Sequence, residues 1–217
     1  MNQANNARTS RLVTQARGGD REAFDGLVEL YAPQVYNLSL RITGSPEEAD
    51  DCVQETFVRA FSAMRSFRGE AGFFTWLYRV ALNVARDAAR RRAHRPLLIS
   101  ELAGPDPNQP APDVAELARR PGGGGGPPSD PGLLASPSAG PEEAVAADRR
   151  RQLLLAAISS LPPHHREVIV LYDLQGLSYQ QVARVTNTRV GTVKSRLNRA
   201  RLALRDCLAP HLDLLRS

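Results

Sequence analysis

A stretch of 46 residues rich in proline and glycine, Pro96 to Pro141, divides the chain into two parts. It contains eleven of the sixteen prolines and eight of the sixteen glycines, five of them in the run Gly122–Gly126. Such a stretch has too little apolar surface to offset the entropy lost on ordering, so we expect a long, flexible linker. The glycine run is not expected to bind phosphate, because no Gly-Lys-Ser/Thr follows it.

The sequence on either side of this linker has the apolar periodicity of helices. A chain of 217 residues has the length of one or two domains. We therefore expect an N-terminal tail at 1–18, a small helical domain at 19–95, the linker at 96–141 and a second helical domain at 142–211. No segment alternates convincingly as a strand does, so the predicted fold class is all-α.

In the first domain, residues 22–42 predict two short helices with a break at Pro33. The next helix begins at Ser45, which can cap it, with Pro46 at the first helical position and Glu48 closing a capping box. Its apolar residues recur at helical spacing: Val53, Phe57, Val58 and Phe61. A long helix is then expected from Ala71 to about Ala93.

The second domain predicts four helices that end in a helix-turn-helix. The first begins at Pro141, where two glutamates suit the helix dipole, and the second is "HHREVIVLYDL". The third, "LSYQQVARV", has a capping box formed by Ser178 and Gln181. Residues 186–188 make a turn, and the fourth helix runs from Arg189 to about Cys207.

The last helix has two distinct faces. Its apolar face holds Val193, Leu197, Ala200 and Leu204, which we expect to pack against Val182 and Val185. Its opposite face presents Gly191, Ser195, Asn198 and Arg199, flanked by Thr192 and Lys194. Arg, Asn and Ser suit base edges, and residues 184–205 hold seven basic residues and no acidic one. We therefore interpret this helix as a DNA reader, against the alternative of a solvated basic helix in a bundle.

The first domain places aromatic residues beside arginines. Five of the chain's twelve aromatics lie between Phe67 and Tyr78. Trp76, Val80 and Val84 follow a core-facing spacing, so most of these aromatics are expected to pack inside. The helix then becomes basic, with Arg86, Arg90, Arg91, Arg92 and Arg95 against Asp87 alone. Phe67 lies before the helix, where a loop aromatic and a basic helix could grip a single strand.

An acidic patch stands near this basic helix in the sequence. It consists of Glu47, Glu48, Asp50, Asp51 and Glu55. The helix dipole accounts for Glu47 and Glu48, but the other three extend further along the helix. An acidic surface does not favour contact with DNA, so we expect these residues to bind a basic protein partner.

Composition restricts the remaining classes of function. The net charge of +5 is modest, so its distribution matters more than its total. Cys52 and Cys207 have no metal-binding spacing, so we expect two reduced thiols. No signal peptide or membrane span is expected, which predicts a cytoplasmic protein.

We find no nucleophile, general-base or metal constellation, so we expect no enzyme, cofactor or metal. His164 and His165 are expected to be surface residues.

Three segments resemble the extracytoplasmic-function group of bacterial RNA polymerase sigma factors: "ADDCVQETFVRAF", "SFRGEAGFFTWLYRVALNVARDAARRR" and "LSYQQVARVTNTRVGTVKSRLNRARLALR". The first domain is similar to sigma region 2 and the second to region 4. The resemblance implies a factor that binds core polymerase, recognises −35 and −10 promoter elements and assists promoter melting. It also implies a response to stress or envelope signals under the control of an anti-sigma factor.

The resemblance assigns roles by position. Docking on the clamp of the polymerase's largest subunit falls to Asp50, Asp51, Gln54 and Glu55, while region 4 contacts the flap of the second-largest subunit. Capture and tracking of the −10 strand fall to Phe67, Trp76, Arg79, Asn83, Arg86, Arg90 and Arg91. Reading of the −35 element falls to Thr192, Lys194, Ser195, Asn198 and Arg199.

Two other classes of protein could carry parts of this pattern. A transcription regulator with a C-terminal helix-turn-helix would bind palindromic DNA as a dimer, without core polymerase. The acidic patch and the aromatic, arginine-rich helix argue against it. An adaptor or anti-sigma protein would bind polymerase without reading DNA, and the outward Ser195, Asn198 and Arg199 argue against that class.

Overall fold

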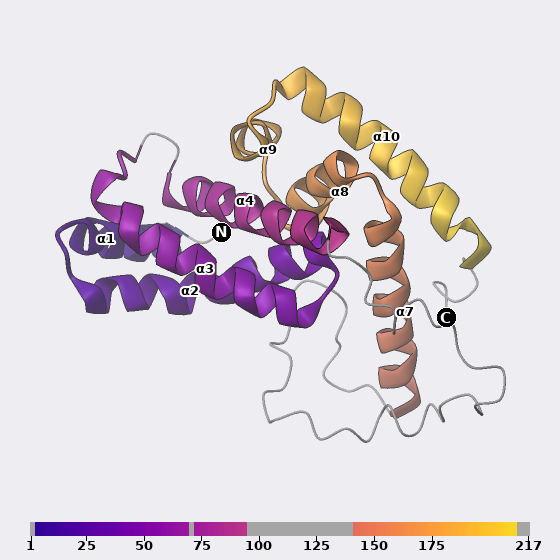
Figure 1. The fold of residues 1–217 in the computed structure, drawn as a ribbon, viewed down its shortest axis with the longest axis horizontal. Helices are drawn as coiled ribbons and strands as arrows, with labels where there is room; N and C mark the ends of the chain where they lie inside the picture. Colours follow the sequence, from indigo (N-terminus) through magenta and orange to yellow (C-terminus); the bar gives the residue numbers. More distant parts are fainter. Residues whose placement is uncertain (1–2, 70–71, 95–140, 212–217) are drawn as a thin grey trace.

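A computed structural model describes residues 3–69, 72–94 and 141–211, and within these ranges the chain is helical with no β-strand (Figure 1). This confirms the all-α prediction. The first half contains α1 (Gln3–Arg17), α2 (Arg21–Thr43), α3 (Pro46–Ala63), the 3-10 turn η1 (Met64–Ser66) and α4 (Phe73–His94). The second half contains α7 (Pro141–Ser160), α8 (Pro163–Ile169), the π-helical turn η2 (Val170–Leu174), α9 (Tyr179–Thr186), α10 (Val190–Leu208) and the 3-10 turn η3 (Ala209–His211). The predicted linker lies outside the described residues except for Pro141, which begins α7.

The segment predicted as an N-terminal tail forms helix α1 and packs on α2. Ala16 is buried, and the Thr9 hydroxyl oxygen lies 3.0 Å from that of Tyr31. Gly26 permits this close packing, because a Cβ added there would lie 3.3 Å from a methyl group of Leu12. The few apolar residues of α1 give a weak periodic signal in the sequence, and the helix depends on tertiary contacts instead.

The predicted break at Pro33 does not occur, since α2 runs continuously from Arg21 to Thr43. Proline inside a helix removes one backbone donor and costs about 3 kcal/mol. On both sides of Pro33, however, α2 buries one apolar face, with Tyr31 4% exposed and Leu27, Val35 and Leu38 fully buried. Burial of these side chains outweighs the cost of the proline, so tertiary packing overrides the local signal.

The capping signals were right at one helix and half right at another. Ser178 and Gln181 form the complete reciprocal capping box at the start of α9. At α3, the Ser45 hydroxyl accepts from the Glu48 amide at 3.3 Å, as predicted. The Glu48 side chain does not close the box, and its carboxylate lies 3.8 Å from the Arg92 guanidinium.

Helices α9 and α10 form the predicted helix-turn-helix. Helix α9 ends at Asn187, whose left-handed φ of 55° reverses the chain, and the Thr188 amide donates to the Ala183 carbonyl. Val182 and Val193 are fully buried where the two helices pack. This packing fixes which face of α10 remains available to solvent.

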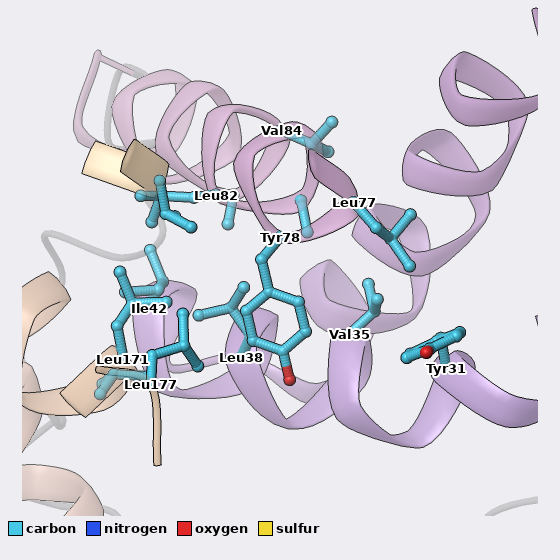
Figure 2. Close-up of a cluster of buried hydrophobic side chains, with 14 of the residues drawn as sticks. Tyr31, Val35, Leu38, Ile42, Leu77, Tyr78, Leu82, Val84, Leu171 and Leu177 are labelled. Atoms are coloured by element: carbon cyan, nitrogen blue, oxygen red, sulfur yellow. The ribbon is translucent and has the colours of Figure 1, made fainter. Parts of the chain in front are cut away.

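The two halves of the molecule dock against each other. Helix α9 lies beside α4, and α7, α8 and η2 contact α2 (Figure 1). Figure 2 shows Leu171 and Leu177 in one cluster with Leu38, Ile42 and Tyr78. The sequence predicted two tethered domains and gave no indication of this contact. In the part of the chain that the structure covers, no helix has the length and apolar character needed to cross a bilayer.

Candidate nucleic-acid and partner interfaces

Helix α10 turns its predicted reading face to solvent. Lys194, Ser195, Asn198 and Arg199 are exposed, and Thr192 is half-buried. The apolar face on the other side is buried: Val193, Leu197 and Ala200 are at most 2% exposed. Leu204 is only partly buried against the same core. Side chains that can bond to base edges and phosphates therefore form one outward stripe, as the sequence predicted.

A cluster that the sequence did not predict holds α10 against η2 and α9. The Arg201 guanidinium donates to both Asp173 carboxylate oxygens, at 3.1 and 2.5 Å, and lies 5.5 Å from the centre of the Tyr172 ring. Tyr172 stacks on Tyr179 with 4.4 Å between ring centroids. The Asp173 hydrogen bond raises the pKa of Arg201. Arg201 is thus engaged within the protein, and its neighbour Arg199 faces outward.

A histidine pair lies behind this stripe, at the start of α8. The rings of His164 and His165 are 4.3 Å apart, and His165 Nδ1 is buried without a hydrogen-bond partner. Burial, followed by the charges of His164, Arg199 and Arg196, lowers the pKa of His165. His164 is exposed as predicted, whereas His165 is half-buried and helps to form the support of the reading helix.

The predicted −10 stripe of α4 is mostly exposed. Arg79, Asn83, Arg90 and Arg91 reach solvent. Arg79, Asn83, Arg86 and Arg90 recur at the spacing of one helical face, which could follow a phosphate backbone. Arg90 lies 3.6 Å from Asp87, and Arg91 lies 3.8 Å from Glu55. Arg86 departs from the rest, because its side chain is only 30% exposed.

Phe67 lies in a packed aromatic cluster and not on an open loop. It is 6% exposed and contacts Phe73 edge-on at 6.0 Å and Trp76 at 4.9 Å between ring centroids. Gly69 and Gly72 have left-handed φ values of 81° and 73°, which glycine adopts readily. Stacking of a base on Phe67 would require the Phe67 ring to separate from Phe73 and Trp76. Trp76, also predicted to contact DNA, is half-buried.

The acidic patch lies on the outer side of α3. Asp50, Asp51 and Gln54 are exposed. Glu55 is half-buried and accepts a hydrogen bond of 2.5 Å from Arg59. This arrangement suits a protein partner that supplies basic groups.

Two apolar residues of α3 extend this surface. Val58 and Phe61 belong to the apolar series at helical spacing but are 66% and 44% exposed. Phe57, from the same series, is buried. The helix therefore has a mixed face, in which exposed apolar side chains follow the acidic residues. Periodicity alone could not separate the two faces, because adjacent positions 57 and 58 are both apolar.

One ion pair joins the two halves and involves a predicted DNA-contact residue. Arg86 Nε and Nη2 each donate to Glu167, at 2.6 Å, and the Arg86 Nη1 atom lies 3.5 Å from Asn83 Oδ1. The hydrogen bond to Glu167 raises the pKa of Arg86. The Tyr78 hydroxyl donates to Gln175 at 2.8 Å, and burial raises its pKa. Sequence reasoning missed these contacts, since the partners lie 81 and 97 residues apart.

The two cysteines differ in accessibility, which gives a testable prediction. Burial, with the nearby Glu55 and Glu48 carboxylates, raises the pKa of Cys52 to about 11, whereas Cys207 is exposed. Because the thiolate is the reactive form, N-ethylmaleimide near neutral pH should modify Cys207 and spare Cys52. Intact-mass spectrometry should show a single adduct on the native protein and a second after denaturation. A native protein with both thiols modified would contradict the burial of Cys52.

Comparison with known families matches both halves of the chain. Residues 27–95 match Sigma-70 region 2, and residues 151–204 match Sigma-70, region 4. The RNA polymerase sigma-H factor of Pseudomonas aeruginosa is 36% identical over 202 residues, which are 93% of this chain and 94% of that protein. The ECF RNA polymerase sigma-E factor of Haemophilus influenzae is 33% identical over 199 residues, covering 92% and 94% of the two chains.

Solved structures share the fold. CnrH in complex with the cytosolic domain of CnrY has a TM-score of 0.63 at 24% identity and covers 94% of this chain and 99% of its own. The sigma factor RpoE in complex with the anti-sigma factor NepR from Bartonella quintana has a TM-score of 0.58 at 22% identity, covering 86% and 96%. Both family matches are present, one in each half of the chain, and the relatives cover both halves. The chain therefore belongs to the extracytoplasmic-function group of RNA polymerase sigma factors, which direct core polymerase to promoters.

Proposed function

We propose that three sets of residues in this sigma factor divide the work of initiation. Helix α3 docks on the clamp of the largest polymerase subunit through Asp50, Asp51, Gln54 and Glu55. Helix α4, with Phe67 and Trp76 at its start, takes up the −10 strand through Arg79, Asn83, Arg86, Arg90 and Arg91. Helix α10 reads the −35 element through Thr192, Lys194, Ser195, Asn198 and Arg199.

The observation that carries this proposal is the outward stripe of α10. A helix that follows a tight turn, buries Val193 and Leu197 and exposes Ser195 and Arg199 has the form of a recognition helix. Arg199 has no ion-pair partner among the described residues, so its guanidinium is available for a guanine edge. The engaged Arg201–Asp173 pair supports the helix from behind.

The exposed acids of α3 support docking on a basic partner. Asp50 and Asp51 reach solvent on α3. Opposite charge on a partner steers encounter and fixes register, and the exposed Val58 and Phe61 add apolar area beside it. We assign this face to the polymerase clamp and the region 4 domain to the flap.

The mechanism follows from binding and not from bond chemistry. Once the protein is bound to core polymerase, α10 fixes its place on duplex DNA. Groups along α4 then hold bases and phosphates of the opened strand, which offsets an unstacking cost of a few kcal/mol per base. The polymerase supplies the catalysis, so the sigma factor itself is not an enzyme and acts in the cytoplasm, where polymerase and promoters meet.

An anti-sigma factor is the second partner we propose. The solved relative RpoE is bound to the anti-sigma factor NepR, and CnrH is bound to the cytosolic domain of CnrY. A partner of this kind would hide the polymerase and DNA surfaces until an envelope or stress signal releases them. Affinity capture of the protein from its native host should recover such a partner in addition to polymerase. Recovery of polymerase alone under all growth conditions would argue against it.

The function can be tested by transcription in vitro. Purified core polymerase, with and without this protein, would transcribe a randomised promoter library, and sequencing of RNA 5′ ends would map the start sites. We expect start sites that depend on the protein and share two upstream elements. If the folded protein adds no start sites and binds palindromic DNA as a dimer, the protein is a helix-turn-helix transcription regulator and not a sigma factor.

A further inference from the structure

We propose that Tyr179 is a positioning residue for promoter recognition, because its ring holds the ammonium group of Lys194 in place beside the reading face of α10. The inference rests on the proposed function, since it takes Lys194 as a −35 contact. It gives a role to a residue of α9 that belongs to none of the three proposed contact sets. Tyr179 acts through Lys194 and not through a contact of its own with DNA.

The contact between these two side chains joins α9 to α10, which lie beside each other at the turn (Figure 1). Lys194 Nζ lies 5.5 Å from the centre of the Tyr179 ring, within the range of a cation–π interaction. Lys194 is exposed, and Tyr179 is half-buried at the start of α9. An ammonium group carries three donors, so the ring leaves N–H groups available for phosphate oxygens.

The Tyr179 ring is itself fixed from two directions. Ser178 and Gln181 set the first turn of α9 through their reciprocal capping box. Tyr172 of η2 stacks on Tyr179, with 4.4 Å between the ring centroids and 25° between the ring planes. The surface that the ring offers to Lys194 is therefore set by the packing of the protein before any DNA is bound.

A second cation of α10 lies at the far end of this tyrosine pair. Arg201 follows Lys194 by seven residues, about two helical turns, and so projects from nearly the same side of the helix. Its guanidinium lies 5.5 Å from the centre of the Tyr172 ring and donates to the Asp173 carboxylate. The tyrosine pair thus carries one cation of α10 at each end, and the carboxylate anchors the end away from Lys194.

Preorganisation explains how this arrangement would favour DNA binding. A surface lysine has a long, flexible stem, and fixing that stem on a phosphate costs conformational entropy. A ring that already confines the ammonium group lowers this cost at the moment of binding. The ring also brings no negative charge, so the full charge of Lys194 remains for the phosphate. Arg201, in contrast, is paired with a carboxylate and is engaged within the protein.

The contact can be measured directly, because Lys194 is the only lysine in the sequence. Reductive methylation with ¹³C-formaldehyde labels its amine and the α-amine of the chain and keeps the positive charge. In NMR spectra of the full-length protein, the Lys194 signal is the one that Lys194→Arg lacks. The ring current of Tyr179 should shift this signal upfield of the signal of free dimethyl-lysine.

Two substitutions of Tyr179 separate the ring from its apolar packing. Tyr179→Phe keeps the ring and should keep the upfield shift. Tyr179→Leu keeps an apolar side chain without an aromatic face and should lose the shift, and circular dichroism would verify its helical content. An unshifted signal in the parent, or the same shift in Tyr179→Leu, would overturn the contact.

The effect on promoter recognition is measured by initiation at increasing concentrations of reconstituted holoenzyme on the mapped promoter. Tyr179→Leu should raise the half-maximal concentration by about 2- to 5-fold, the effect of one exposed cation–π contact, and leave the maximal rate unchanged. Tyr179→Phe should behave as the parent. The matched control is Arg205→Ala, an exposed arginine of α10 away from the tyrosine pair, which should also behave as the parent.

A double-mutant cycle distinguishes positioning from packing. If the ring acts through Lys194, Tyr179→Leu should add no loss to Lys194→Ala, which alone should lower the salt slope of promoter binding by about one. Additive losses would give the ring a separate role, and tighter binding by Tyr179→Leu would mean that the ring holds Lys194 away from DNA. Either result would overturn the proposal. Absence of initiation by the parent would instead overturn the proposed function and this role with it, whereas the NMR shift would still show whether the contact exists.

Discussion

Replacement of Arg199 by alanine should lower −35-dependent transcription by roughly 5- to 150-fold, the equivalent of about 1–3 kcal/mol for one base contact. The reason is geometric: Arg199 projects from the exposed stripe of α10, opposite the buried Leu197. The measurement is initiation by reconstituted holoenzyme on the mapped promoter and on the same promoter with an altered −35 element. The loss should be confined to the intact element.

Arg205→Ala provides the control for this prediction. Arg205 is an exposed arginine of the same helix, and it pairs with Asp206. Its removal subtracts the same charge outside the proposed reading stripe, so transcription should change little. Affinity for core polymerase, measured by fluorescence anisotropy, should stay constant in both variants. A loss of core affinity in Arg199→Ala equal to the loss of transcription would place Arg199 in the polymerase interface instead.

Asp51→Ala should have the reverse effect, with a loss of core affinity of about 2 kcal/mol or more, which is roughly 30-fold. Asp51 is exposed near the centre of the acidic patch, and its truncation would leave a basic group of the clamp unpaired. The measurement is a titration of core polymerase into labelled protein at two salt concentrations. The loss should shrink at high salt, because screening weakens the parent contact.

The matched control for Asp51→Ala is Asp25→Ala, an exposed aspartate on α2 outside the acidic patch. It removes the same charge and should leave core affinity unchanged. Binding of −35 duplex by the free protein should not differ between the two variants. Unaltered core affinity in Asp51→Ala would remove this residue from the interface, and a shift in both variants would indicate a general effect of charge.

The sequence predicted the features that depend on local periodicity and capping. The reading face of α10 follows from the spacing of Val193 and Leu197, and the start of α9 follows from Ser178 and Gln181. Each of these signals lies within a few residues. Local spacing was therefore enough to predict which residues of α10 face solvent. Four of the five residues proposed to contact DNA on this helix are exposed, and the fifth, Thr192, is half-buried.

The predictions that were wrong concern contacts between distant segments. A proline usually interrupts a helix, but α2 continues through Pro33 because Tyr31 and Val35 are buried on either side of it. Phe67 was expected in a loop before the helix, and only its contacts with Phe73 and Trp76 show that this loop residue is covered. Periodicity identifies the apolar side of a helix and does not identify what covers it, so the docking of the domains was not predicted.

The shared apolar cluster around Leu171, Leu177 and Tyr78 also bears on how the molecule unfolds. Two tethered domains with separate cores melt independently, whereas two domains that complete each other's core melt together. The two halves are then one cooperative unit, and a substitution in either half changes the melting temperature of both.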